Sequence, residues 1–169
     1  MTIEELYRSY GKDVFNLALH YCGRVQDAEE IAQDVFLKAF RAMEHFREQA
    51  SWKTWIYRIT VNCALDHVRA IQRPKRFALW HTRPVDPDWK SDDLHPGLAL
   101  EQKEKFRTLW QCLNQLPENQ RNAVILLKME QLRQREAAEI LGISEKALES
   151  LFQRAKKNLG NCMGPKEGK

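Results

Sequence analysis

Glycine and proline are scarce in this sequence, whose 169 residues include only 7 glycines and 6 prolines. Most of the prolines fall in one stretch, residues 74–96. Because both residue types interrupt helices, their scarcity elsewhere leaves long amphipathic segments on either side of that stretch. The sequence therefore predicts two helical halves separated by a linker.

Long apolar runs and a signal peptide are also missing. No segment approaches the roughly 20 consecutive apolar residues of a membrane span. Residues 1–5 have neither the basic nor the apolar part of a secretory signal. We therefore expect a cytoplasmic protein with no direct membrane insertion.

The 4 cysteines and 5 histidines form no metal-binding pattern. The cysteines are widely spaced without a C-x-x-C pair, and the one close pair of possible ligands is His20 with Cys22. Cys63 and Cys112 fall in apolar helical stripes, where a reduced thiol packs as a small hydrophobic group. We expect no metal site, no cofactor and no catalytic residue.

The charge balance is mildly basic. A net charge of +4 and an isoelectric point near 8.9 permit a polyanionic partner. Many ordinary soluble proteins are equally basic, so the function has to be argued from motifs.

Three helices are predicted in the first half. The first follows a capping box at Thr2, the second opens at Asp27, and the third runs from Trp52 to about residue 73 after the capping residue Ser51. Apolar residues at i, i+3, i+4 spacing mark their buried sides. These are Ala28, Ile31, Ala32, Val35, Phe36, Ala39 and Phe40 on the second helix, and Trp52, Ile56, Ile59, Cys63 and Val68 on the third.

The second half, from about residue 98, has the spacing of a helix-turn-helix. A first helix carries Phe106, Leu109, Trp110 and Leu113, and Pro117 suits the first turn of the next one. A helix over residues 134–141, a turn at residues 142–144 and a last helix to about residue 159 follow. We expect a two-helix DNA-binding motif at the end of the chain.

Each position of this motif has a steric reason. Ala138 is small where two helices cross, Gly142 can adopt the left-handed conformation of the turn, and Leu148 returns to the shared core. Ser144 is placed to cap the last helix. Leu151, Phe152, Ala155 and Leu159 continue the inward side with Leu148.

The outward side of the last helix is polar. A solvated face on an ordinary helical hairpin is one interpretation, but the joint match of small residue, glycine and cap favours contact with DNA. The side chains placed to reach bases and phosphates are Lys146, Glu149, Ser150, Gln153, Arg154, Lys156 and Lys157.

These patterns predict an all-α fold, with two small helical domains joined by a flexible linker and a helix-turn-helix in the second. The expected boundaries are residues 1–73, a linker over 74–97, a second domain over 98–163 and a tail over 164–169. Trp80 and Trp89 in the linker fit either anchors on a partner or local packing.

Residues 27–40, DAEEIAQDVFLKAF, closely resemble regions 2.1 and 2.2 of the extracytoplasmic-function (ECF) sigma factors, group 4 of the sigma-70 family. Phe46-Arg47 and residues 52–69 resemble regions 2.3 and 2.4, and residues 116–159 resemble region 4. The resemblance implies a bacterial transcription initiation factor of the stress-response type. Such a factor binds core RNA polymerase, directs it to minus-10 and minus-35 promoter elements and assists melting.

The resemblance also implies three contact surfaces. Core polymerase would be contacted by Asp34, Leu37, Lys38 and Arg41. The minus-10 element, with a flipped base cradled by residues 46–51, would be contacted by Phe46, Arg47, Arg58, Asn62 and Arg69. The outward side of the last helix would contact the minus-35 element, although Glu149 and Leu151 replace basic residues frequent in the family. An anti-sigma factor would be a further partner.

Two other functions fit parts of the sequence. A helix-turn-helix regulator could bind an operator without polymerase and use its first domain for a partner or ligand. An enzyme is disfavoured because the acids of residues 27–34 lie near a helix start, where the dipole stabilises them, and no Glu-x-x-His occurs. For Trp52 and Trp55 the helical stripe favours burial in the core over contact with DNA.

Overall fold

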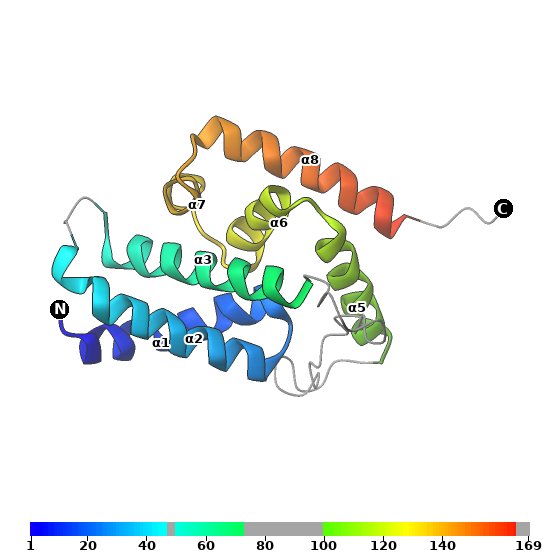
Figure 1. Ribbon diagram of the computed structural model, residues 1–169. Coiled ribbons are helices and arrows are strands. Elements are labelled where there is room, and N and C mark those ends of the chain that lie inside the picture. Colours follow the sequence, from blue (N-terminus) through cyan, green and yellow to red (C-terminus); the bar gives the residue numbers. More distant parts are fainter. Residues whose placement is uncertain (47–49, 73–99, 165–169) are drawn as a thin grey trace. The chain divides into compact units, whose positions relative to one another are not determined.

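The computed structural model describes residues 1–46, 50–72 and 100–164. The chain divides into two compact units, Met1–Trp89 and Lys90–Lys169, and each is described by itself (Figure 1). Every regular element in the described ranges is helical, which confirms the all-α fold class. None of these helices is long and apolar enough to cross a membrane.

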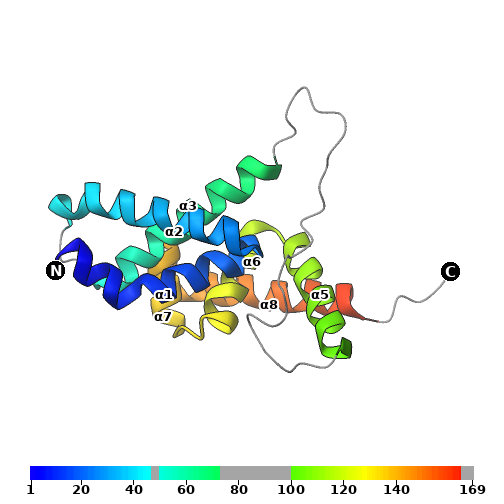
Figure 2. The same cartoon turned by 90° about the horizontal axis from the view of Figure 1, so that it is seen from below.

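The first unit contains α1 (Ile3–Cys22), α2 (Val25–Ala42), a short 3₁₀ turn η1 (Met43–His45) and α3 (Trp52–Gln72). All three long helices pack against one another, as Figures 1 and 2 show from two directions. The capping box at the start of α1 is confirmed: Glu5 N–H donates to Thr2 Oγ1 at 3.2 Å, and Thr2 N–H donates to the Glu5 carboxylate at 2.8 Å. Gly23 ends α1 in the left-handed conformation, at φ 70°.

The core of this unit is formed by the inner faces of its three long helices. Its fully buried members are Leu6, Val14, Leu17, Ala18, Tyr21, Ala28, Ile31, Val35, Ala39, Ile56, Thr60 and Ala64. Phe40 was predicted inside but is 61% exposed, and Phe36 is only half-buried. The predicted stripe on α2 was too wide, because α1 and α3 cover only the side that carries Ala28, Ile31, Val35 and Ala39.

One helix start in this unit differs from the sequence prediction. α2 begins at Val25 rather than Asp27, and Asp27 lies in its first turn, where a carboxylate is favourable. The start of α3 is as expected, since Thr54 N–H donates to Ser51 Oγ at 3.0 Å. Trp52 and Ile59, predicted to be buried, are half-buried, because the inner side of α3 is centred on other residues: Ile56, Thr60, Val61, Ala64, Leu65 and Val68.

The second unit contains α5 (Leu100–Gln115), α6 (Glu118–Val124), a π-helical turn η2 (Ile125–Met129), α7 (Gln134–Leu141) and α8 (Glu145–Met163). α8 packs against α5, α6 and α7. The buried side chains include Trp110, Leu113, Ala123, Ile125, Leu126, Ala137, Ile140, Leu148 and Ala155. Leu109 was expected on the buried side of α5 but is 36% exposed. The side chain of Phe106 and the linker residues Trp80 and Trp89 lie outside the described part.

A disulfide between Cys112 on α5 and Cys162 on α8 overturns one expectation. Cys112 was predicted to be a reduced thiol, because its apolar surroundings alone do not reveal a cysteine that is 50 residues away. The partner lies beyond the predicted end of the last helix at about residue 159, whereas α8 continues to Met163. Cys22 and Cys63 are buried free cysteines.

Candidate nucleic-acid interface

The helix-turn-helix consists of α7, a tight turn and α8. Gly142 occupies the left-handed conformation at φ 66°, ψ 32°, where a side chain would be strained. Ser144 Oγ accepts a hydrogen bond from Ala147 N–H at 3.1 Å and so caps α8, as predicted. Gln134 Nε2 donates to the Glu145 carbonyl at 3.0 Å, which ties the first turn of α7 to the first turn of α8. The small Ala138 is buried between these helices.

The polar side chains predicted on α8 are all exposed, and together they form the α8 polar face: Lys146, Glu149, Ser150, Gln153, Arg154, Lys156 and Lys157. Helical spacing places Lys146, Ser150, Gln153 and Lys157 in one row along its centre. The Ser150 hydroxyl donates to the Lys146 carbonyl at 3.1 Å, so its lone pairs are left to accept a hydrogen bond.

A lysine from outside α8 extends this face. Lys128 Nζ lies 5.4 Å from the ring centroid of Phe152, and Lys156 Nζ lies 6.0 Å from the same ring. Both distances suit a cation–π contact. Lys128 belongs to the π-helical turn η2, and no periodicity in the sequence indicates that it meets Phe152. The sequence prediction missed it for that reason.

The four residues predicted for polymerase docking are exposed on α2. Asp34, Leu37, Lys38 and Arg41 follow i, i+3, i+4, i+7 spacing and so share one side of the helix, here called the α2 stripe. Leu37 is 48% exposed, and the 61% exposed Phe40 follows three residues later. Two large apolar side chains therefore stand in solvent beside charged ones.

Three aromatic rings, here called the aromatic cluster, lie where the connector after η1 meets α3. Phe46 stacks on Trp52 with ring centroids 3.9 Å apart, and Trp55 lies edge-on to Trp52 at 5.5 Å. All three side chains are half-buried. The predicted burial of Trp52 and Trp55 in the core is therefore met only in part, since the cluster keeps part of its surface in solvent. Arg47 lies outside the described residues.

A polar stripe on α3 follows the aromatic cluster. Arg58, Asn62 and Arg69 are exposed at i, i+4, i+11 spacing, which places them on one side of the helix. Arg69 Nη1 lies 3.4 Å from the Asp66 carboxylate, and both side chains are largely exposed. A phosphate would compete with this pair at small cost, because exposed ion pairs contribute little.

His67 also has a specific neighbour. Its Nε2 lies 3.7 Å from the Asp27 carboxylate, and both side chains are mostly buried between α2 and α3. The exposed Glu30 lies close enough that the possible ligand atoms of all three residues fall within 4.8 Å of one another. The sequence prediction treated these residues separately, because Asp27 and His67 come together only through helix packing.

Two sigma-70 family models match the chain: sigma-70 region 2 over residues 6–74 and sigma-70 region 4 over residues 106–159. The first covers the unit with the aromatic cluster, and the second covers most of the unit with the helix-turn-helix. Together they span most of the chain, in the family's order.

Individual relatives agree. The RNA polymerase sigma-H factor of Pseudomonas aeruginosa is 28% identical over 173 residues, which are 95% of this chain and 85% of that protein. The ECF RNA polymerase sigma factor SigM of Bacillus subtilis is 28% identical over 159 residues, 94% of this chain and 93% of that protein. The solved structure of CnrH in complex with the cytosolic domain of CnrY has a TM-score of 0.69 at 20% identity. It covers 98% of this chain and 89% of that one, which shows a shared fold.

A helix-turn-helix unit, together with a three-helix unit that exposes aromatic and basic side chains, defines a DNA-binding protein of the transcription machinery. The chain belongs to the sigma-70 family and, within it, to the ECF sigma factors of group 4. It is therefore a transcription initiation factor, which binds core RNA polymerase and directs it to promoter DNA. The alternative of an operator-binding regulator that acts without polymerase is not supported.

Proposed function

We propose that the exposed surfaces described above divide the work of promoter recognition. The α2 stripe docks on core polymerase, the aromatic cluster and the α3 polar stripe hold the opened minus-10 strand, and the α8 polar face contacts the minus-35 element. The protein acts in the cytoplasm and has no catalytic role of its own. The bond-forming chemistry belongs to the polymerase.

The aromatic cluster is the observation that carries this proposal. An unstacked base needs an apolar plane to stack on, and base–aromatic stacking contributes about 1–3 kcal/mol per base. The half-buried rings of Trp52 and Trp55, which keep part of their surface in solvent, offer such planes. On the same helix, Asn62 can hydrogen-bond an exposed base edge, while Arg58 and Arg69 can hold phosphates. A protein that reads only duplex DNA does not need this combination.

The docking role of the α2 stripe is supported by its composition. Most of the binding free energy of a protein–protein interface comes from a few apolar or arginine side chains that are surrounded by polar groups. Leu37 offers an apolar anchor, Arg41 a cationic one, and Asp34 and Lys38 can fix the register by charge complementarity. The exposed Phe40 beside Leu37 enlarges the apolar part of this surface.

An anti-sigma factor is the proposed regulatory partner. The solved structure of CnrH, which shares the fold, is a complex with the cytosolic domain of CnrY. A protein that covered Leu37 and Phe40 on this chain would remove apolar surface from water and block polymerase docking at the same time. Its binding would therefore compete with core polymerase.

Run-off transcription tests the proposed function. The purified chain is added to core RNA polymerase and a promoter template, and we expect a specific transcript that core polymerase alone does not produce. The matched variant Gly142→Val, which strains the helix-turn-helix turn, should abolish transcripts that depend on the minus-35 element. No specific transcript at any tested promoter, combined with stable operator binding in the absence of polymerase, would overturn the proposal.

A further inference from the structure

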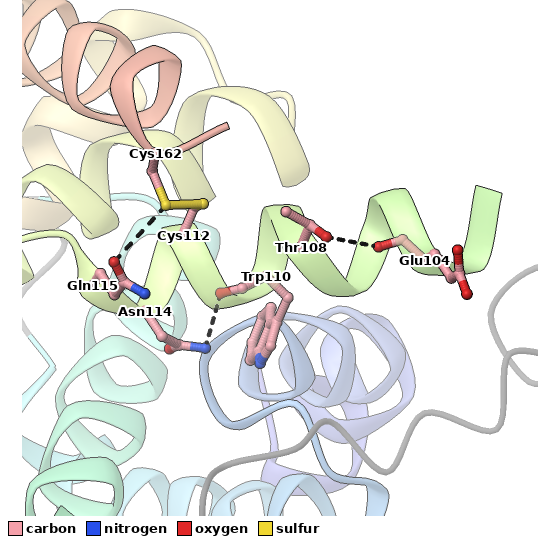
Figure 3. The surroundings of a disulfide bond; sticks show 7 residues. All are labelled: Glu104, Thr108, Trp110, Cys112, Asn114, Gln115 and Cys162. Carbon is pink, nitrogen blue, oxygen red and sulfur yellow. Dashed lines mark hydrogen bonds between the residues drawn. A yellow bond between two sulfur atoms is a disulfide. The ribbon is translucent and has the colours of Figure 1, made fainter. Parts of the chain in front are cut away.

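The Cys112–Cys162 disulfide closes the second unit into a covalent loop (Figure 3). Cys112 lies in α5 and is 3% exposed, whereas Cys162 lies in the last turn of α8 and is partly exposed. The two are 50 residues apart, so the loop encloses α6, η2, α7 and the whole α8 polar face. No other covalent link between the helices of this unit occurs in the described residues.

The last turn of α8 is weak without this bond. Gly160 and Asn161 are poor helix formers. The turn also lacks packing at Gly160, because a Cβ added there would meet nothing within 4 Å. The preceding turn is held by Asn158 Nδ2, which donates to Gln120 Oε1 of α6 at 2.8 Å. Cys162 is thus the residue that fastens the end of α8 to α5.

The disulfide spans the α8 polar face, which is the surface proposed to contact the minus-35 element. This step depends on the proposed function, since a sigma factor works where polymerase works. Thiols there are kept reduced, and the disulfides that do form are mostly transient, catalytic or redox-sensing. The other two cysteines, Cys22 and Cys63, are buried and free, so oxidation is confined to the pair that spans the helix-turn-helix.

We propose that Cys112 and Cys162 form a reversible redox site that couples the thiol–disulfide balance of the cell to minus-35 binding. In the oxidised form the disulfide holds α5 against α8, and the α8 polar face is ordered for contact with DNA. Reduction releases the end of α8, lowers the population of the binding-competent unit and weakens promoter binding. The reductant is a dithiol of the thioredoxin class.

The exchange proceeds by two thiolate attacks. A thiolate of the dithiol attacks the more accessible Cys162 Sγ, a mixed disulfide forms, and Cys112 leaves as a thiolate that takes up a proton. The second thiolate of the dithiol then attacks its own half of the mixed disulfide and releases Cys162, which is also protonated. Two electrons and two protons pass to the protein, and the dithiol becomes a disulfide. Gln115 Oε1 lies 3.8 Å from Cys162 Sγ, where it can accept a hydrogen bond from the thiol once the bond is broken.

The test uses the full chain bound to core polymerase. The protein is equilibrated with defined ratios of reduced and oxidised dithiothreitol, its thiols are counted by maleimide labelling and mass spectrometry, and promoter binding is measured by fluorescence anisotropy. If reduction leaves about a tenth of the second unit competent, the apparent Kd rises about tenfold. The thiol and binding curves should share one midpoint.

Three variants sharpen the result. Cys162→Ser should bind with the affinity of the reduced protein in every buffer, whereas Cys63→Ser should titrate like the wild type. Gly160→Ala strengthens the last turn of α8 independently of the disulfide. The difference in promoter affinity between the oxidised and reduced forms should therefore be smaller in this variant than in the wild type. If Cys162→Ser does not fold, the wild-type titration still decides, because it needs no substitution.

Equal promoter affinity at both ends of the titration would overturn the redox proposal, and so would a folded Cys162→Ser variant that binds like the oxidised wild type. The failure of the proposed function would look different. In that case neither redox form would direct core polymerase to a promoter. If the oxidised and reduced forms directed equal and specific transcription, only the redox role would be disproved.

Discussion

The ring of Phe46 lies on the ring of Trp52, with centroids 3.9 Å apart and planes inclined by 28°. Trp55 approaches the same pair, with its centroid 5.1 Å from that of Phe46. Phe46 precedes α3 and both tryptophans belong to its first turn, so the stack fixes how the connector enters the helix. The same contact therefore serves the local fold and the proposed base-stacking surface.

Replacing Trp52 by leucine should impair promoter opening more than polymerase docking. The change removes a ring pair that contributes about 0.5–1.5 kcal/mol and a surface on which a base can stack. Permanganate reactivity of thymines in the minus-10 region should fall, while core binding stays within about twofold. Trp52→Phe, which keeps a ring, should recover most of the opening. Normal opening with Trp52→Leu would exclude the cluster from strand separation.

The α2 stripe gives a separate prediction for polymerase. Asp34→Lys combined with Leu37→Ser reverses one charge and removes an exposed apolar contact, and neither residue belongs to the core. Like charges placed together at an interface cost several kcal/mol, so pulldown of core polymerase should weaken at least about tenfold. Circular dichroism should be unchanged. Glu29→Lys, an exposed charge reversal on another side of α2, is the control. Undiminished pulldown of the folded double variant would remove the stripe from the docking surface.

Asn62 is predicted to act after docking. It lies on the exposed side of α3, in line with Arg58 and Arg69. Asn62→Ala should leave core binding intact and reduce the promoter bubble seen by permanganate footprinting, since a base edge loses its hydrogen-bond partner. Asp66→Asn is the control, because it releases Arg69 from an ion pair without removing a DNA contact. A bubble of normal extent in Asn62→Ala would show that the assignment is wrong.

Local signals in the sequence predicted the elements of the helix-turn-helix closely. The bounds of α7, the left-handed Gly142 and the Ser144 cap depend on neighbouring residues only, and each was found where the pattern placed it. Exposure of the α8 polar face followed from helical periodicity in the same way. These features could be predicted because backbone geometry and capping act within one or two turns.

Features that depend on contacts between distant residues could not be predicted. The periodicity around Phe40 is indistinguishable from that of a buried residue, and only the arrangement of α1 and α3 leaves it in solvent. Likewise, Cys112 finds Cys162 only after α5 and α8 have packed together. The Asp27–His67 contact and the approach of Lys128 to Phe152 have the same origin.

Cys22 should react slowly with alkylating agents in the folded protein. Burial raises the pKa of its thiol from 9.0 to about 11, and only the thiolate reacts. At pH 8 the folded protein should therefore be alkylated at Cys22 roughly a hundred times more slowly than the urea-denatured protein. Mass spectrometry of iodoacetamide-treated samples measures both rates. The rate in the folded protein should keep rising up to pH 11, while that in urea is half-maximal near pH 9 and levels off above about pH 10. A plateau above about pH 10 in the folded protein would contradict the shift.

The raised pKa of Cys22 also stabilises the fold in a definite pH range. Below pH 9 the thiol is protonated in both the folded and the unfolded chain, and its contribution to the free energy of unfolding is fully present. As the pH rises from 9 to 11, the unfolded chain loses this proton more readily than the folded one. The contribution is then lost, by about 2–3 kcal/mol for two pKa units. The Cys22→Ala variant should lack this part of the alkaline decline.

The α8 polar face should contain two kinds of residue whose substitution changes DNA binding in different ways. Ser150, Gln153 and Arg154 are placed to meet base edges, whereas Lys156 and Lys157 lie nearer the C-terminal end and are placed to meet the backbone. Loss of a base contact should cost about 1–3 kcal/mol at one position of the minus-35 element. Loss of a phosphate contact should weaken binding to all sequences alike.

Salt dependence separates these two roles. A lysine that neutralises one phosphate releases condensed counterions, so Lys157→Ala should lower the slope of log affinity against log salt by roughly 0.9. Gln153→Ala carries no charge change and should leave the slope unaltered while it relaxes base preference. Lys156→Ala is a comparison within the backbone-facing pair, because its ammonium lies 6.0 Å from the Phe152 ring and shares that ring with Lys128. We therefore expect a smaller change in slope for Lys156→Ala than for Lys157→Ala.

Competition binding with holoenzyme against a library varied through the minus-35 element measures both the salt slope and the base preference. If Lys157→Ala shifted base preference and Gln153→Ala shifted only the slope, α8 would lie on DNA in the opposite orientation.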